Sequence, residues 1–310
     1  MITPLKRFIL ILFLLLPLNA SGMPGAEIGN MVIRQDTTWS GRIIIKGVVV
    51  VGRGVTLSIS PGTIIAFRRL DQNDDGVGDG EIRVLGRLLA KGSAVRPITF
   101  RSAEPDPRPR DWSYVLLFTS GRKSVIDYCR FQYAFSGLQV QFSTATVTNC
   151  LFANNNEGLR FGRAKLNIDH NEFRDNNIAI RFTRMEGPVE IKFNDISHNH
   201  VGIFLVPSGQ NIVDFFDPGH SGRPWNEGHL EIVNNNIYAN DDYNLKLGAK
   251  QKWNLKISGN WWGGADPRII RAGIFDHQRD PDLGRALITP LSATRISEAG
   301  IKNCVPLRRP

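Results

Sequence analysis

Residues 150–159 read Cys-Leu-Phe-Ala-Asn-Asn-Asn-Glu-Gly-Leu, and related segments return along the chain at a nearly constant period. The apolar anchors that end each repeated triplet are separated by 21, 21, 23, 41 and 25 residues. The triplets are Cys129-Arg130-Phe131, Cys150-Leu151-Phe152, Asn171-Glu172-Phe173, Asn194-Asp195-Ile196, Asn235-Asn236-Ile237 and Asn260-Trp261-Trp262. A fixed period of this length indicates stacked coils, and short apolar strands without helical spacing predict an all-β solenoid, a β-helix.

Two columns of asparagine accompany this repeat. One column occupies the first position of the triplets from Asn171 onward, and the other lies three residues after each apolar anchor, at Asn155, Asn176, Asn199 and Asn240. Strands of neighbouring coils lie about 4.8 Å apart, so each amide can donate to the carbonyl of the next amide in its column. We therefore interpret both columns as architecture, since a column of charges would repel itself.

The pattern divides the chain into four parts. We predict a signal peptide over residues 1–22, a linker over 23–36, the β-helix over 37–263, and a cap with a tail over 264–310. The triplet spacing doubles near residues 208–228, where prolines interrupt the pattern. We expect a partial strand and an irregular insertion there.

The first residues have the composition of an export signal. Lys6-Arg7 precede an apolar run from Phe8 to Leu18, and the small residues Ala20-Ser21-Gly22 follow. This run is shorter than the roughly 20 residues that a membrane span needs, although an uncleaved anchor is the alternative. We expect cleavage near Gly22, no transmembrane span afterwards, and a periplasmic, cell-surface or secreted protein.

The charge balance is basic. The formal net charge is +9 for the whole chain and falls to +7 once Lys6 and Arg7 are removed. A basic exported surface suits a polysaccharide or another cell-envelope glycan, or lipid headgroups. We expect no nucleic-acid partner, because the usual sequence motifs for one are absent.

The three cysteines cannot all pair with one another. Cys129 and Cys150 share one repeat position, so they should stack on neighbouring coils with their side chains pointing in parallel. That geometry is poor for a disulfide. We predict two buried thiols, with Cys304 in the tail.

Segments on either side of the regular repeats carry a family resemblance. They include Val55 to Thr63, Leu85 to Gly92, Asn260-Trp261-Trp262-Gly263 and Asp266-Pro267. With the repeats between them, they resemble the right-handed parallel β-helix proteins, the superfamily that includes pectate lyases and carbohydrate-binding and sugar-hydrolase modules. The resemblance covers residues from about Trp39 to Pro290. It implies a single-stranded right-handed parallel β-helix with a C-terminal cap, and it leaves the activity open.

The most specific local motif is Asp71-Gln72-Asn73-Asp74-Asp75-Gly76-Val77-Gly78-Asp79-Gly80-Glu81, which is similar to a calcium loop. Such loops place oxygen ligands at alternate positions and a glycine at the sixth. The candidate Ca²⁺ ligands are Asp71, Asn73, Asp75, Val77, Asp79 and Glu81. The twelfth position is Ile82 instead of the usual bidentate Glu, so the predicted site departs from the EF-hand pattern; an acidic Asp-Gly turn is the alternative.

A second candidate site lies in the irregular segment. Aromatic rings beside polar groups suit sugar stacking, and loops on a rigid scaffold commonly carry function. The predicted ligand-binding residues are Phe215, Phe216, Asp217, His220, Arg223 and Trp225.

Catalysis and transition-metal binding have less support. A glycoside hydrolase needs two opposed carboxylates, and Asp241-Asp242 is at a turn position of the repeat. His198 and His200 flank Asn199 without a third ligand at suitable spacing, and Asp175 shares a repeat position with His198. We therefore expect an exported non-catalytic β-helix protein with a structural or carbohydrate-binding role. The alternatives are a polysaccharide lyase, hydrolase or epimerase acting on an acidic glycan, and a periplasmic accessory factor for a metalloenzyme.

Overall fold

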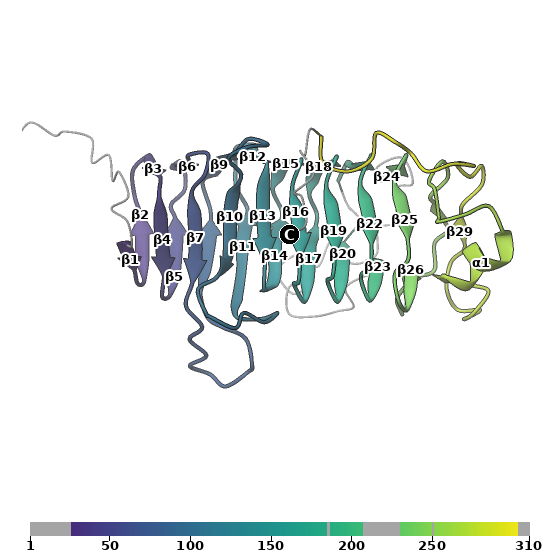
Figure 1. Ribbon diagram of the computed structural model, residues 1–310, viewed down its shortest axis with the longest axis horizontal. Helices are drawn as coiled ribbons and strands as arrows, with labels where there is room; N and C mark the ends of the chain where they lie inside the picture. Colours follow the sequence, from purple (N-terminus) through teal and green to yellow (C-terminus); the bar gives the residue numbers. More distant parts are fainter. Residues whose placement is uncertain (1–25, 185–186, 207–229, 250, 303–310) are drawn as a thin grey trace, which may run out of the picture.

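The computed structural model describes residues 26–184, 187–206, 230–249 and 251–302. Within these ranges the chain winds into a solenoid whose coils follow one another along a single axis (Figure 1). Every named strand pair is parallel, and the strands form three long sheets. The predicted all-β solenoid is therefore confirmed.

Sheet A holds the strands that contain the repeated triplets. Its order is β1 (Ala26–Ile28), β4 (Arg42–Ile45), β7 (Ile64–Phe67), β10 (Ile98–Ser102), β13 (Cys129–Gln132), β16 (Leu151–Ala153), β19 (Glu172–Arg174), β22 (Asp195–Ser197) and β25 (Asn236–Tyr238).

Sheet B follows sheet A in each coil and has the longest strands. Its order is β2 (Met31–Ile33), β5 (Val48–Val51), β8 (Glu81–Val84), β11 (Trp112–Phe118), β14 (Ala134–Gln141), β17 (Glu157–Gly162), β20 (Ile178–Arg184), β23 (Val201–Leu205), β26 (Tyr243–Leu247) and β28 (Ile274–Phe275).

Sheet C closes each coil. Its strands are β3 (Thr37–Trp39), β6 (Thr56–Ile59), β9 (Arg87–Lys91), β12 (Ser124–Asp127), β15 (Thr144–Thr148), β18 (Lys165–Asp169), β21 (Val189–Lys192) and β24 (Leu230–Val233).

The interior is filled by side chains that stack from coil to coil. Phe100, Phe131, Phe152 and Phe173 lie on successive strands of sheet A with neighbouring ring centroids 4.7, 4.9 and 4.8 Å apart and the planes nearly parallel. Alternate residues of a strand point to opposite faces, so the residues beside these rings point outward. Because equivalent residues of successive coils stack on one another, the sequence repeat produces one continuous core.

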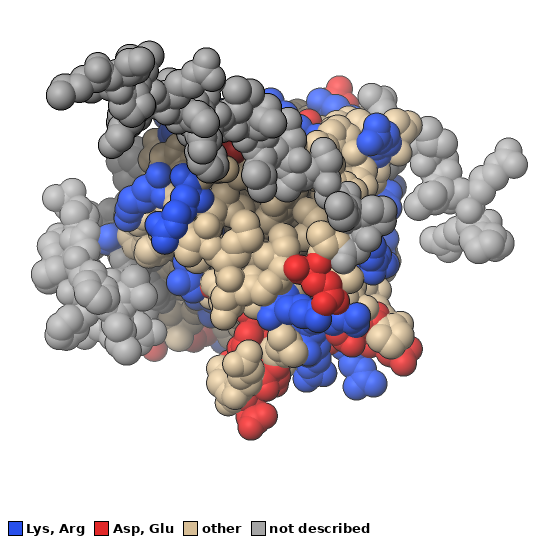
Figure 2. Space-filling view, turned by 90° about the vertical axis from the view of Figure 1, so that its left-hand side faces the viewer, with Lys and Arg blue, Asp and Glu red and all other residues tan. Residues whose placement is uncertain are grey.

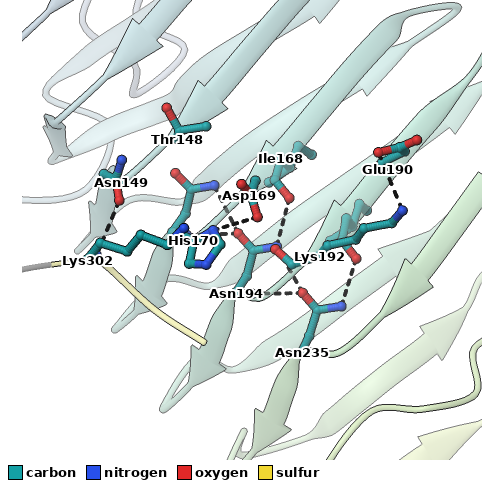
Figure 3. A network of polar contacts seen from close by, with 12 residues as sticks. Thr148, Asn149, Ile168, Asp169, His170, Glu190, Lys192, Asn194, Asn235 and Lys302 are labelled. Atoms are coloured by element: carbon teal, nitrogen blue, oxygen red, sulfur yellow. Dashed lines mark hydrogen bonds and ion pairs between the residues drawn. The ribbon is translucent and has the colours of Figure 1, made fainter. Parts of the chain in front are cut away.

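Both predicted asparagine ladders are present. Asn171 Nδ2 donates to Asn194 Oδ1 at 2.9 Å, and Asn194 repeats this bond with Asn235 at 2.9 Å (Figure 3). The other ladder runs through Asn155, Asn176, Asn199 and Asn240 with the same geometry.

Cys129 and Cys150 continue the first ladder as buried free thiols, as predicted. The backbone N–H of Cys129 lies 3.4 Å from Cys150 Sγ, and that of Cys150 donates to Asn171 Oδ1 at 2.9 Å. Burial is the main reason that the pKa of the Cys129 thiol is raised well above its usual value. Cys304 lies outside the described residues.

Two predicted boundaries are wrong. The segment predicted as a linker over 23–36 contains β1 and β2, which pair with β4 and β5, so the described coils begin at Ala26. At the other end, β28 pairs with β26, and the coil therefore continues past residue 263. These three short strands were missed because two or three residues carry too little periodicity to be recognised. The predicted insertion at 208–228 lies outside the described residues.

The C-terminal cap has more structure than the sequence reading predicted. Helix α1 (Pro267–Ala272) begins after Asp266, whose side chain accepts a hydrogen bond from the N–H of Arg268, and a fourth, two-stranded sheet pairs β27 (Leu255–Lys256) with β29 (Ala286–Leu287). Trp262, the apolar anchor of the last triplet, is buried in the core.

Residues 291–302, here called the C-terminal strap, run back from the cap along the coils (yellow in Figure 1). Its backbone exchanges two hydrogen bonds with Asn236 through Ile296, and the N–H of Gly300 donates to Phe193 O at 2.9 Å. Near its end, the N–H of Lys302 donates to Asn149 Oδ1 at 3.2 Å (Figure 3). The strap therefore ties four coils together and lies beside the outer face of sheet A.

Candidate functional site

The outward side chains of sheet A change from coil to coil. Glu172, Asp195 and Asn236 occupy equivalent register positions on β19, β22 and β25. Each directly follows a ladder asparagine and precedes a buried apolar anchor, so strand alternation turns it to the outer face of sheet A. The strap covers Asp195 and Asn236 on that face, and both are buried. Two carboxylates thus lie on neighbouring strands.

The turns that follow these strands add a second column. Asp175 and His198 have positive φ angles of 58° and 57°, and the N–H of Asp175 donates to the carbonyl of His198 at 2.9 Å. Their shared repeat position is confirmed. The ionic partner of Asp175 is Arg174, however, rather than His198.

Sheet A and the strap enclose an open cleft of about 820 Å³. Most of its lining side chains are polar. The lining residues are Glu172, Arg174, Asp175, Asp195, Ser197, His198, Tyr238, Arg295, Ala299, Gly300 and Ile301.

Arg174 organises the side of the cleft formed by sheet A. Its guanidinium contacts Glu172 at 2.9 Å and Asp175 at 2.5 Å. Burial opposes the positive charge of Arg174, but the hydrogen bonds and charges of these two acids outweigh it and raise the pKa of Arg174. Both carboxylates therefore have a cationic partner.

Arg295 organises the side formed by the strap. It donates a hydrogen bond to Asp195 at 2.7 Å, and this bond is the main cause of the raised pKa of Arg295. Ser197 Oγ also donates to Asp195, at 3.1 Å. The Arg295 guanidinium lies 5.6 Å from the ring centroid of Tyr238, which packs against Trp261 at 5.0 Å. The strap thus supplies part of the cleft.

This arrangement is suited to hydrogen bonding. Carboxylates, guanidinium groups, Ser197 and Tyr238 can bind hydroxyl groups from several directions. General-acid catalysis of glycoside cleavage needs a carboxyl group that keeps its proton. Each of the three carboxylates in the cleft has a guanidinium group within ion-pair distance instead.

The predicted calcium loop lies on an arm that projects from the solenoid, far from this cleft. The arm joins residues 68–80 to 103–111, since the N–H of Gly78 donates to Arg110 O at 2.9 Å and the N–H of Arg69 to Glu104 Oε1 at 3.1 Å. Acidic and basic side chains gather on this arm, below an end of the solenoid whose visible residues are mostly neither acidic nor basic (Figure 2).

The loop closes on itself through its own side chains. Asp71 accepts hydrogen bonds from the N–H groups of Asp75 and Gly76, at 3.1 and 3.0 Å. Asp75 accepts from the N–H of Val77, and Asp79 from that of Gln72. Gly76 has a φ of 79°, as the sixth position of a calcium loop requires.

Glu81 does not belong to this loop. It is the first residue of β8, and its buried carboxylate contacts Arg83 at 2.5 Å. Strand pairing, which the motif spacing did not reveal, removes it from the candidate ligands. Among the described residues no three acidic, histidine or cysteine side chains form a group that could hold a metal ion. A Ca²⁺ site at Asp71, Asn73, Asp75, Val77 and Asp79 therefore stays a prediction and would lack a closing acid.

The predicted ligand-binding residues Phe215, Phe216, Asp217, His220, Arg223 and Trp225 all lie outside the described residues, so that site stays a prediction. The cleft beside sheet A was missed at the level of sequence. Its signal was the middle position of the repeated triplets, where Glu172 and Asp195 replace the Leu151 of an earlier coil. The strap could not be placed from sequence, because it follows the last repeat.

The comparisons with known proteins agree with this architecture. A family model described as the right-handed beta helix region matches residues 114–265. No curated protein and no solved structure matches the chain. Within the part of the chain that the structure describes, no helix is long and apolar enough to cross a membrane. The matched family model and the three stacked parallel sheets identify the chain as a right-handed parallel β-helix repeat protein.

Proposed function

We propose that this protein is an exported, non-catalytic β-helix that binds carbohydrate in the cleft between sheet A and the C-terminal strap. The observation that carries the proposal is the set of polar side chains that three neighbouring coils and the strap direct into one open space. A rigid solenoid holds these groups in place, so that little conformational entropy is lost on binding.

The charges of the cleft favour a neutral glycan. Three carboxylates, those of Glu172, Asp175 and Asp195, face two guanidinium groups, those of Arg174 and Arg295. An acidic sugar would meet an excess of negative charge, whereas neutral hydroxyls can donate to the carboxylates and accept from the guanidinium groups. The exposed faces of Tyr238 and His198 add ring surface at the same place.

Export is part of the proposal and rests on the N-terminal sequence. Lys6-Arg7, the following apolar run and the small residues near Gly22 support it. N-terminal sequencing of the protein recovered from the periplasmic and secreted fractions tests it. A mature N-terminus close to residue 23 supports export, and an intact Met1 in the cytoplasmic fraction contradicts it.

A glycan array followed by calorimetry tests the binding site. We expect the wild-type protein to bind a neutral glycan, and Arg174→Ala to weaken that binding about tenfold by removing the group that orients two carboxylates. Arg130→Ala is the matched control, because Arg130 lies on the outer face of sheet A in β13, outside the cleft. Equal affinities of the Arg174 and Arg130 variants would place the binding elsewhere.

One observation favours a second function, glycoside hydrolysis. Glu172 and Asp195 lie on adjacent strands, and strands about 4.8 Å apart bring such side chains near the separation found in retaining glycosidases. Incubation with any glycan found by the array, followed by analysis of the products, decides between the two functions. Shortened products from the wild type that are lost in Glu172→Gln and Asp195→Asn would establish an enzyme.

A further inference from the structure

The outer face of sheet B carries a column of cationic and aromatic side chains. Gln139, Arg160, Arg181 and Phe204 occupy equivalent positions on β14, β17, β20 and β23, and Lys246 follows on β26. The column contains no acid. It lies on a different face of each coil from the cleft and takes no part in the proposed function.

In the neighbouring column of sheet B, a single carboxylate, that of Glu157, lies near two of these arginines. Glu157, with 1% of its side chain exposed, contacts Arg181 through Oε1 at 2.6 Å. Its Oε2 is 3.9 Å from Arg160 Nη1, beyond hydrogen-bond distance. Arg160 therefore makes no hydrogen bond with this carboxylate, which is already bound to Arg181.

The surroundings of Arg160 disfavour its charge. Burial is the main cause of the lowered pKa of Arg160, and the charge of Arg181 lowers it further against the attraction of Glu157. The Nε atoms of Arg160 and Arg181, Glu157 Oε2 and Ser136 Oγ are shielded from solvent and have no hydrogen-bond partner in the described part of the chain. Leaving such buried groups without a partner costs stability, because they lose their hydrogen bonds to water without gaining others. The Nε–H donors of Arg160 and Arg181 lack an acceptor, Glu157 Oε2 lacks a donor, and the two guanidinium groups with the one carboxylate carry an excess of one positive charge.

We propose that Arg160 and Arg181, above Ser136 and Glu157, form a second binding site that takes a singly charged oxyanion on a glycan, either a uronate carboxylate or a sulfate ester. One negative charge balances the two guanidinium groups and the carboxylate. A planar guanidinium fork matches such oxyanions in geometry. Half-buried Tyr114, Leu116 and Phe204 lie in the same two columns and offer apolar surface to a sugar ring.

Calorimetry with polygalacturonate, dextran sulfate and uncharged dextran tests the proposal. We expect the wild type to bind at least one of the two anionic polymers at least tenfold more tightly than dextran, and the preferred polymer identifies the oxyanion. Arg160→Ala should abolish this preference. The variant should fold, because Glu157 keeps Arg181 as its partner, and an unchanged melting temperature verifies this. Arg160→Lys keeps the charge but loses the fork, so an intermediate affinity is expected.

Lys165→Ala is the matched control. Lys165 is an exposed cation at the start of β18 on sheet C, and its loss removes the same charge from another face. Wild-type affinity in Arg160→Ala would overturn the proposal, and so would an equal loss in Lys165→Ala, which would indicate non-specific attraction to the basic chain. Binding of neutral glycans in the cleft is measured separately with the Arg174 variant, so either site can fail without the other.

Discussion

Two columns of side chains that are one residue apart in sequence follow opposite rules. The inward column Asn171, Asn194, Asn235 and Asn260 repeats one residue, and each of these side chains is buried with 0% exposure. The next position along the chain reads Glu172, Asp195, Asn236 and Trp261. In this ladder each amide hydrogen-bonds to the amide stacked on it, whereas the outward position has no such requirement.

The reason is the strand spacing. Each ladder amide donates to its neighbour and also to a backbone carbonyl, as Asn194 does to Asn235 Oδ1 and Ile168 O, both at 2.9 Å (Figure 3). A different side chain would leave these buried groups unsatisfied. In a repeat protein, sameness along a column therefore indicates architecture, and variation on the outer face indicates where a ligand can be recognised.

The largest expected effect comes from a substitution that breaks an asparagine ladder. Asn176→Asp replaces an amide that donates to Asn199 Oδ1 and Phe152 O, both at 2.9 Å, by a buried carboxylate facing those acceptors. We expect a loss of about 3 kcal/mol or more in the free energy of unfolding. Asn177→Asp, at the exposed neighbouring position, should change it by about 0.5 kcal/mol or less. Urea denaturation of both variants measures the difference, and equal midpoints would contradict the architectural role of the column.

The second-largest expected effect concerns the outer face of sheet A, where a ligand can be recognised. Tyr238→Ala removes a ring that lines the cleft and should weaken neutral-glycan binding about tenfold, on the order of 1.4 kcal/mol. Trp225→Ala tests the ligand segment predicted from sequence on the same glycan. Calorimetry on both variants decides between the two places, and a loss confined to Trp225→Ala would move the site away from the cleft.

The third prediction concerns pH and the outer face of sheet B. Burial and a hydrogen bond with Glu81 raise the pKa of Tyr114 to about 12 from its ordinary value of 10.0. The stability that depends on the neutral phenol is complete below pH 10 and is lost as the pH rises through about 12. Because the side chain is partly exposed, we expect only about 1 kcal/mol. Tyr114→Phe should flatten the decline between pH 10 and 12 in urea denaturation, and at pH 7 it should lose what the hydrogen bond of the phenol with Glu81 contributes; an unchanged decline would assign it to other groups.

The smallest expected effect is that of Ca²⁺ on the arm. The loop already satisfies its backbone N–H groups through Asp71 and Asp75, and Glu81 is committed to Arg83. We expect millimolar Ca²⁺ to raise the melting temperature by about 2 °C or less, and Asp75→Ala to abolish that rise. A rise of 5 °C or more in differential scanning calorimetry would show that the loop finds a ligand beyond the five that remain without Glu81.

Sequence reasoning succeeded wherever one coil repeats the next. The stack of Phe131, Phe152 and Phe173, both asparagine columns and the two free thiols follow from a period near 21 residues, because each residue contacts its own equivalent. It failed at the ends of the solenoid, where β1, β2 and β28 have only two or three residues. The N-terminal signal of α1, Asp266 followed by Pro267, was readable but lay beyond the last repeat.

The sequence by itself determined the coil, its inward columns and the positions that point outward. These features depend on strand alternation and on a repeat that stacks equivalent residues of successive coils on one another. Only the tertiary structure decided which outward residues share a site. The strap brings Arg295 to Asp195, 100 residues away in sequence, and parallel pairing moves Glu81 out of the calcium loop and onto sheet B. These contacts depend on where non-repeating segments pack against the solenoid, and the sequence repeat carries no information about that position.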